Sequence, residues 1–161
     1  MNRKEREIKD TSDIVDVLKR CNTIRLGLIN NGKPYVVPVS FGFDIENGRI
    51  VIYFHGAVLG LKCDCIAENN NVCVEADIFY KVEQTEIGIT ARYESVIGNG
   101  VVCRVDGEQK IYGLRKLVEH YGYTDYPIER CKGLDHTAVY KIVLSEISGK
   151  RNLPSGVSTE G

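Results

Sequence analysis

Tryptophan is absent from this chain of 161 residues, and no apolar run approaches the roughly 20 residues that a membrane-spanning helix needs. The opening segment, residues 1–7, lacks the apolar core of a signal peptide. Neither sign of charge dominates, because 21 basic side chains stand against 22 acidic ones, and the electrostatic footprint of a nucleic-acid-binding protein is missing. These absences predict a cytoplasmic protein that binds neither membranes nor nucleic acid.

Two common cofactor motifs are missing as well. No two cysteines have the Cys-x-x-Cys spacing of zinc sites, although the chain has six of them. We expect these residues to remain thiols that pack as small buried hydrophobic side chains. No Gly-x-Gly-x-x-Gly follows a predicted strand, so NADH or NADPH would visit as a transient reductant and would not reside in a Rossmann fold.

Length and composition favour one globular domain. A chain of 161 residues with 43% hydrophobic residues can bury a core without metal or disulfide cross-links. Residues 148–161 are polar and contain several glycines and serines, a composition that predicts disorder when such a segment is alone. We therefore divide the chain into a folded domain over residues 1–147 and a polar C-terminal tail over residues 148–161.

Hydrophobic periodicity and turn residues predict six strands and three helices. The strands are expected over residues 23–29, 35–45, 49–55, 72–80, 87–105 and 138–147, and the helices over residues 12–21, 61–69 and 108–121. The turn sequences Asn31-Gly32 and Asn47-Gly48 are typical of tight hairpins, which join antiparallel strands. The pattern therefore predicts an α+β fold built on a small antiparallel barrel with a few flanking helices.

Three residues inside the predicted strands should interrupt regular pairing. Pro38 cannot donate a hydrogen bond to a strand ladder, so it should lie at a sheet edge or at a bulge. Gly98 and Gly100 should bend the long fifth strand through bulges. An interrupted strand leaves backbone groups free for a ligand.

The stretch from Val51 to Lys62, VIYFHGAVLGLK, is typical of a phosphate site beside a flat ligand. An alternating strand runs into a histidine, a loop bounded by glycines and a lysine at the opening turn of a predicted helix. The first amides of a helix lack intrahelical partners and carry the positive end of its dipole, so an anion there would also meet the ammonium of Lys62. The alternative is that Gly60 only permits a turn and Lys62 is a solvated surface residue.

Two further polar residues occupy places where a barrel would otherwise carry apolar ones. Arg25 lies between apolar neighbours in the first predicted strand, and Ser95 lies in the long fifth strand. With Lys62 they would offer a guanidinium, a hydroxyl and an ammonium to one phosphate. Taken separately, Arg25 could be a half-buried ion-pair member and Ser95 an ordinary strand serine.

Six motifs, in order from residue 2 to about residue 122, resemble the flavin-binding split barrels of the pyridoxamine 5'-phosphate oxidase type, and within them the nitroimidazole-resistance (Nim-type) branch. The motifs are Asn2-Arg-Lys-Glu-Arg-Glu-Ile8, Arg25-Leu-Gly27, Pro34-Tyr-Val-Val-Pro-Val-Ser-Phe-Gly42, Tyr53-Phe-His-Gly56, Gly60-Leu-Lys62 and Tyr93-Glu-Ser-Val-Ile-Gly-Asn-Gly100. The resemblance implies an antiparallel six-stranded split β-barrel. It also implies a homodimer with FMN in the groove between the subunits.

The resemblance assigns roles to the candidate residues. The flavin phosphate would lie near Lys62 and Ser95, and the ring would lie along two strand segments, Pro38-Val39-Ser40 and Tyr53-Phe54-His55. His55 would lie in the active site, where a neutral imidazole could exchange a proton with a substrate; the alternative is a structural, hydrogen-bonded histidine. The family pattern often has a small or hydroxyl residue after this histidine and an arginine before the lysine, where this chain has Gly56 and Leu61.

The resemblance, together with the candidate residues, implies an FMN-binding oxidoreductase that reduces small electrophiles such as nitroaromatic compounds with NADH or NADPH. FAD is the less favoured cofactor. Two alternatives stay open, a non-catalytic module that binds flavin or haem and an enzyme of the pyridoxamine-phosphate-oxidase type. The second is less favoured because the matched residues contain no further basic cluster for a substrate phosphate.

Overall fold

The computed structural model describes residues 3–154 of the chain. The α-helices are α1 (Thr11–Arg20), α2 (Leu61–Glu68) and α3 (Gly107–His120), and the short 3₁₀ helices are η1 (Lys4–Arg6), η2 (Ile128–Arg130) and η3 (Leu134–His136). The strands are β1 (Glu7–Ile8), β2 (Ile24–Asn30), β3 (Lys33–Val39), β4 (Phe41–Glu46), β5 (Arg49–Ala57), β6 (Asn71–Thr85), β7 (Gly88–Val105) and β8 (Thr137–Asn152). All three predicted α-helices are confirmed to within one residue at each end.

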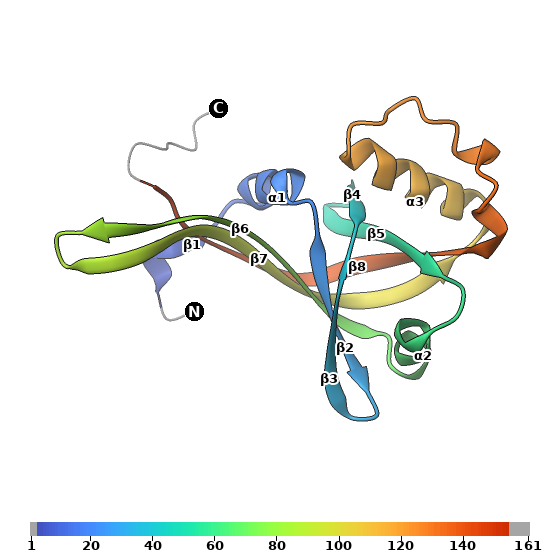
Figure 1. The fold of residues 1–161 in the computed structure, drawn as a ribbon, viewed down its shortest axis with the longest axis horizontal. Helices are drawn as coiled ribbons and strands as arrows, with labels where there is room; N and C mark the ends of the chain where they lie inside the picture. Colours follow the sequence, from blue (N-terminus) through green and yellow to red (C-terminus); the bar gives the residue numbers. More distant parts are fainter. Residues whose placement is uncertain (1–2, 155–161) are drawn as a thin grey trace.

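The strands form one antiparallel sheet in the order β3-β2-β6-β7-β8-β5-β4, with β1 added on β8 (Figure 1). The two outer strands of this order, β3 and β4, are consecutive in the chain and only Ser40 separates them. The sheet must therefore curl until the end of β3 lies next to the start of β4; these two strands are not paired with each other, so the barrel is open between them. The predicted α+β antiparallel barrel is confirmed.

The structure has eight strands where six were predicted, for two reasons. The expected strand over residues 35–45 is divided at Ser40 into β3, which pairs with β2, and β4, which pairs with β5. Pro38 lies in β3, an edge strand of the sheet order, as predicted. The two-residue strand β1 is the other addition, and it is too short to show a periodic pattern in the sequence.

Tight turns fix the register of both short hairpins. Asn31 and Gly32 have φ values of 49° and 75° between β2 and β3, and Asn47 and Gly48 have φ values of 51° and 76° between β4 and β5. Asparagine and glycine tolerate this left-handed region better than other residues, which is why the two turn predictions are confirmed.

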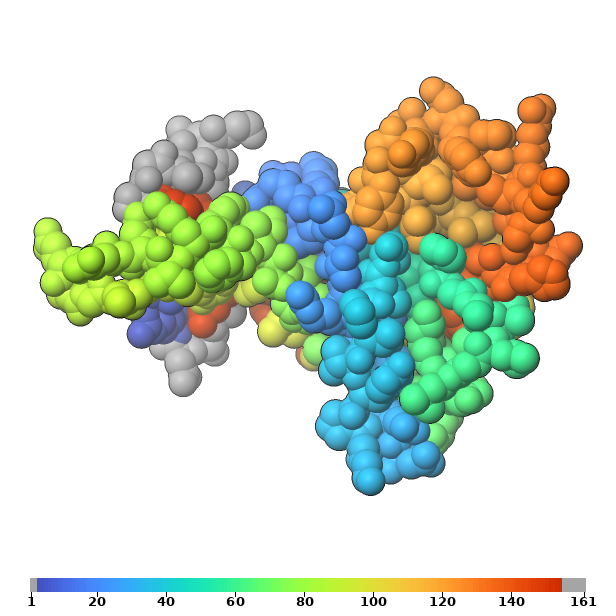
Figure 2. All heavy atoms as spheres, in the orientation of Figure 1, coloured from blue at the N-terminus to red at the C-terminus, as the bar shows by residue number. Residues whose placement is uncertain are grey.

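The hairpin of β6 and β7 is the longest element, and its outer half projects from the body of the molecule (Figure 2). Strand β6 continues to Thr85, five residues past its predicted end at Tyr80. Its pairing with β7 shifts register around Tyr80, and the pairing of β7 with β8 shifts between Asn99 and Gly100. The second irregularity lies at Gly100, one of the two glycines predicted to form bulges, whereas Gly98 is regularly paired with Val74 and Ile147.

Strand β8 continues five residues beyond its predicted end at Ile147. Residues Ser148 to Asn152 pair with Tyr93 to Ile97 of β7, and Gly149 and Lys150 also pair with β1. The predicted boundary at residue 147 therefore falls inside β8. The disorder expected of this polar segment alone does not occur up to Asn152, because neighbouring strands satisfy its backbone on one or both sides. The rest of the predicted tail, residues 155–161, lies outside the described residues.

Buried side chains form one large core inside the barrel and a smaller one under α3. The smaller core contains Val105, Leu114, Ile128 and Val139. Helix α3 approaches β5 closely because Gly113 has no side chain; a Cβ atom there would lie 2.7 Å from the Tyr53 ring. Among the described residues, no helix combines the length and apolarity needed to cross a bilayer.

Candidate functional site

Helix α2 begins at Leu61 after Gly60, whose φ of 130° is a conformation that other residues rarely adopt. Lys62 in its first turn is half-buried, and its ammonium lies 5.3 Å from the centroid of the Phe54 ring. Burial lowers the pKa of Lys62 below its ordinary value. Within residues 3–154 no carboxylate lies close enough to form an ion pair with it. A partly dehydrated cation without a counter-charge is suited to an anionic ligand.

Gly56, one of the two departures from the family pattern, makes room for this ammonium. A Cβ atom at position 56 would lie 2.6 Å from Nζ of Lys62, closer than atoms can pack. The backbone of β5 and the ring of Phe54 therefore form the surface against which Lys62 lies. The absence of a side chain at position 56 means that no hydroxyl there can donate a hydrogen bond to a ligand, but it also lets Lys62 approach the strand.

His55 lies beside Lys62 on the exposed end of β5. Its pKa is lowered, first because surrounding protein atoms displace part of the water around the ring and second because of the positive charge of Lys62. The imidazole is therefore neutral at pH 7. The exposed Ser40 directly precedes Phe41, which pairs with Phe54, so Ser40 lies next to this end of the β4–β5 ladder.

The segments predicted to line a flavin ring divide between exposed and buried side chains. Pro38, Ser40 and His55 are exposed. Val39, Tyr53 and Phe54 belong to the core, where Phe54 stacks on Tyr140 with ring centroids 5.0 Å apart and the Tyr53 hydroxyl donates to Glu46 over 2.6 Å. These three buried residues could meet a ring only through their backbone.

Arg25 and Ser95 form a second group, on the outer face of β2, β6 and β7. The guanidinium of Arg25 donates to Glu75 over 2.9 Å and also to Asp77, and Asp77 is paired with Ser95 across the β6–β7 ladder. Two carboxylates thus already balance the charge of Arg25. We call Arg25, Asp77 and Ser95 the strand row.

The three predicted phosphate ligands are not brought together within one chain. Lys62 lies against Gly56, which pairs with Ala138 near the start of β8, whereas Ser95 pairs with Lys150 near its end. Figure 1 shows these two ends of β8 on opposite sides of the molecule. In the part of the chain that the structure describes, no hydrogen bond or ion pair joins Lys62 to the strand row.

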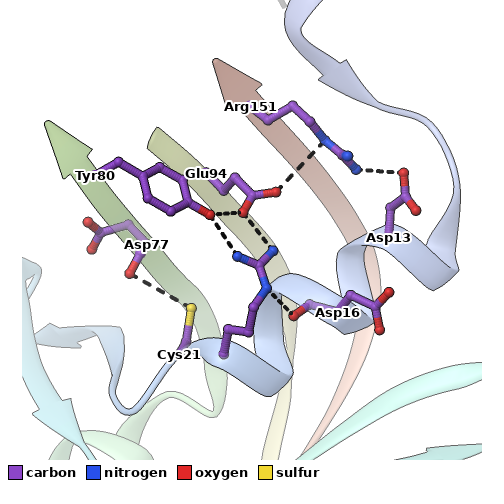
Figure 3. A network of polar contacts seen from close by, with 8 residues as sticks. Asp13, Asp16, Cys21, Asp77, Tyr80, Glu94 and Arg151 are labelled. Atoms are coloured by element: carbon purple, nitrogen blue, oxygen red, sulfur yellow. Dashed lines mark hydrogen bonds and ion pairs between the residues drawn. The ribbon is translucent and has the colours of Figure 1, made fainter. Parts of the chain in front are cut away.

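Sequence reasoning missed a buried ionic cluster on the other face of the same strands (Figure 3). The Glu94 side chain, only 2% exposed, pairs with Arg20 over 2.6 Å and accepts a 2.6 Å hydrogen bond from the Tyr80 hydroxyl. Arg151 lies 3.9 Å from Glu94 and pairs with Asp13 over 2.6 Å. The cluster fastens both ends of α1 to β6, β7 and β8.

A signal for this cluster is present in the sequence. Glu94 falls at an inward position of β7, between the outward residues Tyr93 and Ser95, so strict alternation along the strand would have placed a carboxylate in the core. A buried carboxylate requires a cationic partner. Its partners come from α1 and from the segment predicted as a tail, which is why the cluster was missed.

The described residues contain no group of three or more histidine, cysteine, aspartate or glutamate side chains that could hold a metal ion. All six cysteines are free thiols, as predicted. Cys21 and Cys65 are buried, Cys63, Cys73 and Cys131 are partly buried, and Cys103 is exposed, so the prediction that they are buried holds for only part of the set.

Comparison with known proteins agrees with the fold and motifs. The chain is similar over 89% of its length to 85% of a protein from Bacteroides thetaiotaomicron assigned to 5-nitroimidazole antibiotic resistance, with 25% identity and a TM-score of 0.77. Its fold is also similar to that of an FAD- and heme-binding protein from Mycobacterium smegmatis (18% identity, 94% and 77% of the two chains, TM-score 0.76). The flavocytochrome Anf3 from Azotobacter vinelandii shares it too (20% identity, 96% and 72% of the two chains, TM-score 0.73).

No curated protein matches the sequence. The sequence model of one family does match, and it covers residues 10–151, from the start of α1 almost to the end of β8. The chain therefore belongs to the pyridoxamine 5'-phosphate oxidase family, the split-barrel family that its motifs resemble.

Proposed function

We propose that this protein is a homodimeric flavoprotein that binds FMN and uses NADH or NADPH to reduce small electrophiles such as nitroaromatic compounds. The observation that carries the proposal is the half-buried ammonium of Lys62, which has no counter-charge within the described chain and lies at the first turn of α2. The amides of that turn and the helix dipole favour an anion at the same place. The phosphate of FMN is an anion of this kind.

His55 lies beside this anion site and has a neutral imidazole at pH 7, because its pKa is lowered. A neutral ring can accept a proton from a reaction partner or hold one in place through a hydrogen bond. A bound flavin would supply the hydride or electron transfer. The protein would hold the flavin ring in place, and His55 would exchange the proton.

A dimer would complete the site. The two groups of candidate ligands lie at opposite ends of β8, so one phosphate could meet both only if Lys62 of one copy faces the strand row of a second. The outer face that carries the row also exposes large apolar side chains, with Val36 61%, Phe79 60% and Ile97 48% exposed. An exposed apolar sheet face with charged residues among the apolar ones is typical of a subunit interface.

A second candidate function has support from the structural relatives. The flavocytochrome and the FAD- and heme-binding protein share the fold, so a carrier of FAD, with or without haem, is the alternative. The two functions differ in turnover. An oxidoreductase oxidises NADH or NADPH catalytically when a nitroaromatic is present, whereas a carrier does not.

The test begins with the absorption spectrum of the purified protein and identification of the flavin released on denaturation. We expect flavin bands, release of FMN, and nitroaromatic-dependent NADH or NADPH oxidation. Lys62→Ala should weaken FMN binding roughly ten- to a hundred-fold, while the exposed Lys33→Ala, a control of the same chemistry, should not. Equal affinity of the wild type for FMN and riboflavin would overturn the phosphate site, and flavin binding without turnover would favour the carrier.

A further inference from the structure

Strand β8 places a cation, Lys150, next to the strand row. Lys150 lies in the segment predicted as a polar tail. Lys150 pairs directly with Ser95 on β7 and with Glu7 on β1. Directly opposite residues of antiparallel strands point to the same face, with Cβ atoms about 4.5–5.5 Å apart. The Lys150 side chain therefore extends the strand row by one strand, beside the Ser95 hydroxyl.

The neighbours of Lys150 in sequence fix which way its side chain points. Gly149 faces the core, since a Cβ atom there would lie 2.8 Å from Cβ of Ile8, and Arg151 faces the buried cluster around Glu94 (Figure 3). Successive strand residues point to opposite faces, so Lys150 must face outward. Pairing on both sides holds the backbone of this part of β8, so the Cα position of Lys150 is fixed.

The charge of Lys150 is available to a ligand. Across residues 3–154, Lys150 is half-buried and has no ion-pair partner within 4.0 Å, and the Ser95 side chain makes no hydrogen bond. Arg25, the other cation on this face, already binds Glu75 and Asp77. Of the two cations, Lys150 is thus the one that an incoming anion can pair with while leaving existing ion pairs intact.

We infer that Lys150, together with Ser95, is a ligand of the flavin phosphate, an inference that rests on the proposed function. The ammonium supplies a point charge and the hydroxyl a neutral donor, and the strand ladder places the two residues side by side before the ligand arrives. Arg25 then acts as a positioning residue, because its ion pairs hold Asp77, the carboxylate next to Ser95, and balance its charge. In a dimer the phosphate would lie between this pair and Lys62 of the second copy.

The experiment compares binding of FMN and riboflavin, which differ in the phosphate, to the apoprotein by flavin fluorescence. We expect Lys150→Ala to weaken FMN binding roughly ten- to a hundred-fold and riboflavin binding by less than about threefold. Lys150→Arg should recover most of the FMN affinity, because the charge is kept. Lys33→Ala, an exposed lysine at the start of β3, is the control and should change neither affinity.

Three outcomes would overturn the inference. Lys150→Ala with unchanged FMN affinity would exclude a contact with the phosphate. An equal loss for FMN and riboflavin, together with a lower midpoint of unfolding for the apoprotein, would show that Lys150 supports the β1–β8–β7 ladder. A wild-type protein that binds neither flavin would overturn the proposed function and this inference together, whereas wild-type binding with an insensitive Lys150 would overturn the inference alone.

Discussion

The ammonium of Lys62 fills the space that a side chain at Gly56 would need, since Nζ of Lys62 lies only 2.6 Å from where a Cβ atom of residue 56 would be. The glycine belongs to a regular strand and its φ is not positive, so the backbone does not require glycine at this position. The observed position of the Lys62 ammonium, in contrast, leaves no room for a side chain at position 56. A small change on β5 should therefore act on the anion site at α2 without touching a ligand directly.

Gly56→Ala should displace the Lys62 ammonium and weaken FMN binding by about tenfold, the equivalent of one weakened charge-assisted hydrogen bond. The lysine is flexible, so the fold should be kept and the midpoint of thermal unfolding should stay the same or rise slightly. Titration of the apoprotein with FMN measures the effect. Gly133→Ala, where a Cβ atom would meet nothing within 4 Å, is the control; equal affinities for both variants would contradict the coupling.

His55→Ala should retain FMN, because the anion site around Lys62 does not depend on the imidazole. If His55 exchanges a proton with the substrate, turnover of a nitroaromatic per bound flavin should fall roughly 10² to 10⁴-fold. Steady-state rates and flavin content are measured on the same preparation. An unchanged rate per flavin would remove His55 from the mechanism, and loss of flavin with a lower melting temperature would make it a structural residue.

The pKa of His55 should lie below the ordinary histidine value of about 6.5 when measured by NMR titration of its ring protons. Lys62→Met should raise it part of the way back, because loss of hydration, the larger cause, remains. Since the folded pKa is below the unfolded one, the unfolded chain binds the proton more tightly. Stability should therefore decrease as the pH falls from about 6.5 towards the folded pKa. A His55 pKa that does not respond to Lys62→Met would show that the two charges do not interact.

Glu94→Gln should destabilise the protein, because it leaves two arginines beside a neutral buried amide. Removing one partner of a buried ion pair costs roughly 3–5 kcal/mol, and we expect the lower end of this range because the Arg20 side chain is 46% exposed. Chemical denaturation measures the free energy of unfolding. Glu75→Gln, which breaks the more exposed pair with Arg25, should cost only about 0–1 kcal/mol, and equal costs would contradict a structural role for the buried cluster.

The oligomeric state should respond to a charge on the outer face of β7. Light scattering should give twice the chain mass of 18.0 kDa for the wild type. Ile97→Glu should shift this value towards the monomer and reduce bound flavin, because a carboxylate would be buried in the interface. Ile45→Glu is the matched control, since Ile45 is 50% exposed against 48% for Ile97 but lies on β4. A wild-type monomer that carries flavin would contradict the dimer.

Local signals were sufficient for most of the fold. Asn31-Gly32 and Asn47-Gly48 specify tight hairpins through their backbone conformation alone, and Pro38 marks an edge strand because it lacks an amide hydrogen. The end of β8 could not be found in this way. Its residues after Ile147 are polar, and strand structure there depends on pairing with β7 and β1, which are distant in sequence.

The candidate site was predictable in its parts but not in its assembly. The helix start at Gly60 and the exposed ends of β3 and β5 follow from local patterns, which is why Lys62 and His55 could be singled out. Whether Arg25 reaches a ligand or a carboxylate depends on which strand lies beside β2. That neighbour is β6, which carries Glu75 and Asp77, and its place is set by the topology of the barrel.

Ser40 is the single residue between β3 and β4. Strands β3 and β4 belong to two separate local hairpins, and Ser40 between them takes part in no ladder pairing. The next amide, that of Phe41, donates to the Tyr121 hydroxyl at the end of α3, and this hydrogen bond holds the start of β4 against that helix. Because β2 also pairs with β6 and β5 also pairs with β8, the rest of the sheet sets the angle between the two hairpins. A ligand lying between Pro38 and His55 would meet the backbone of Ser40, which no ladder uses, so binding there would not require any strand to unpair.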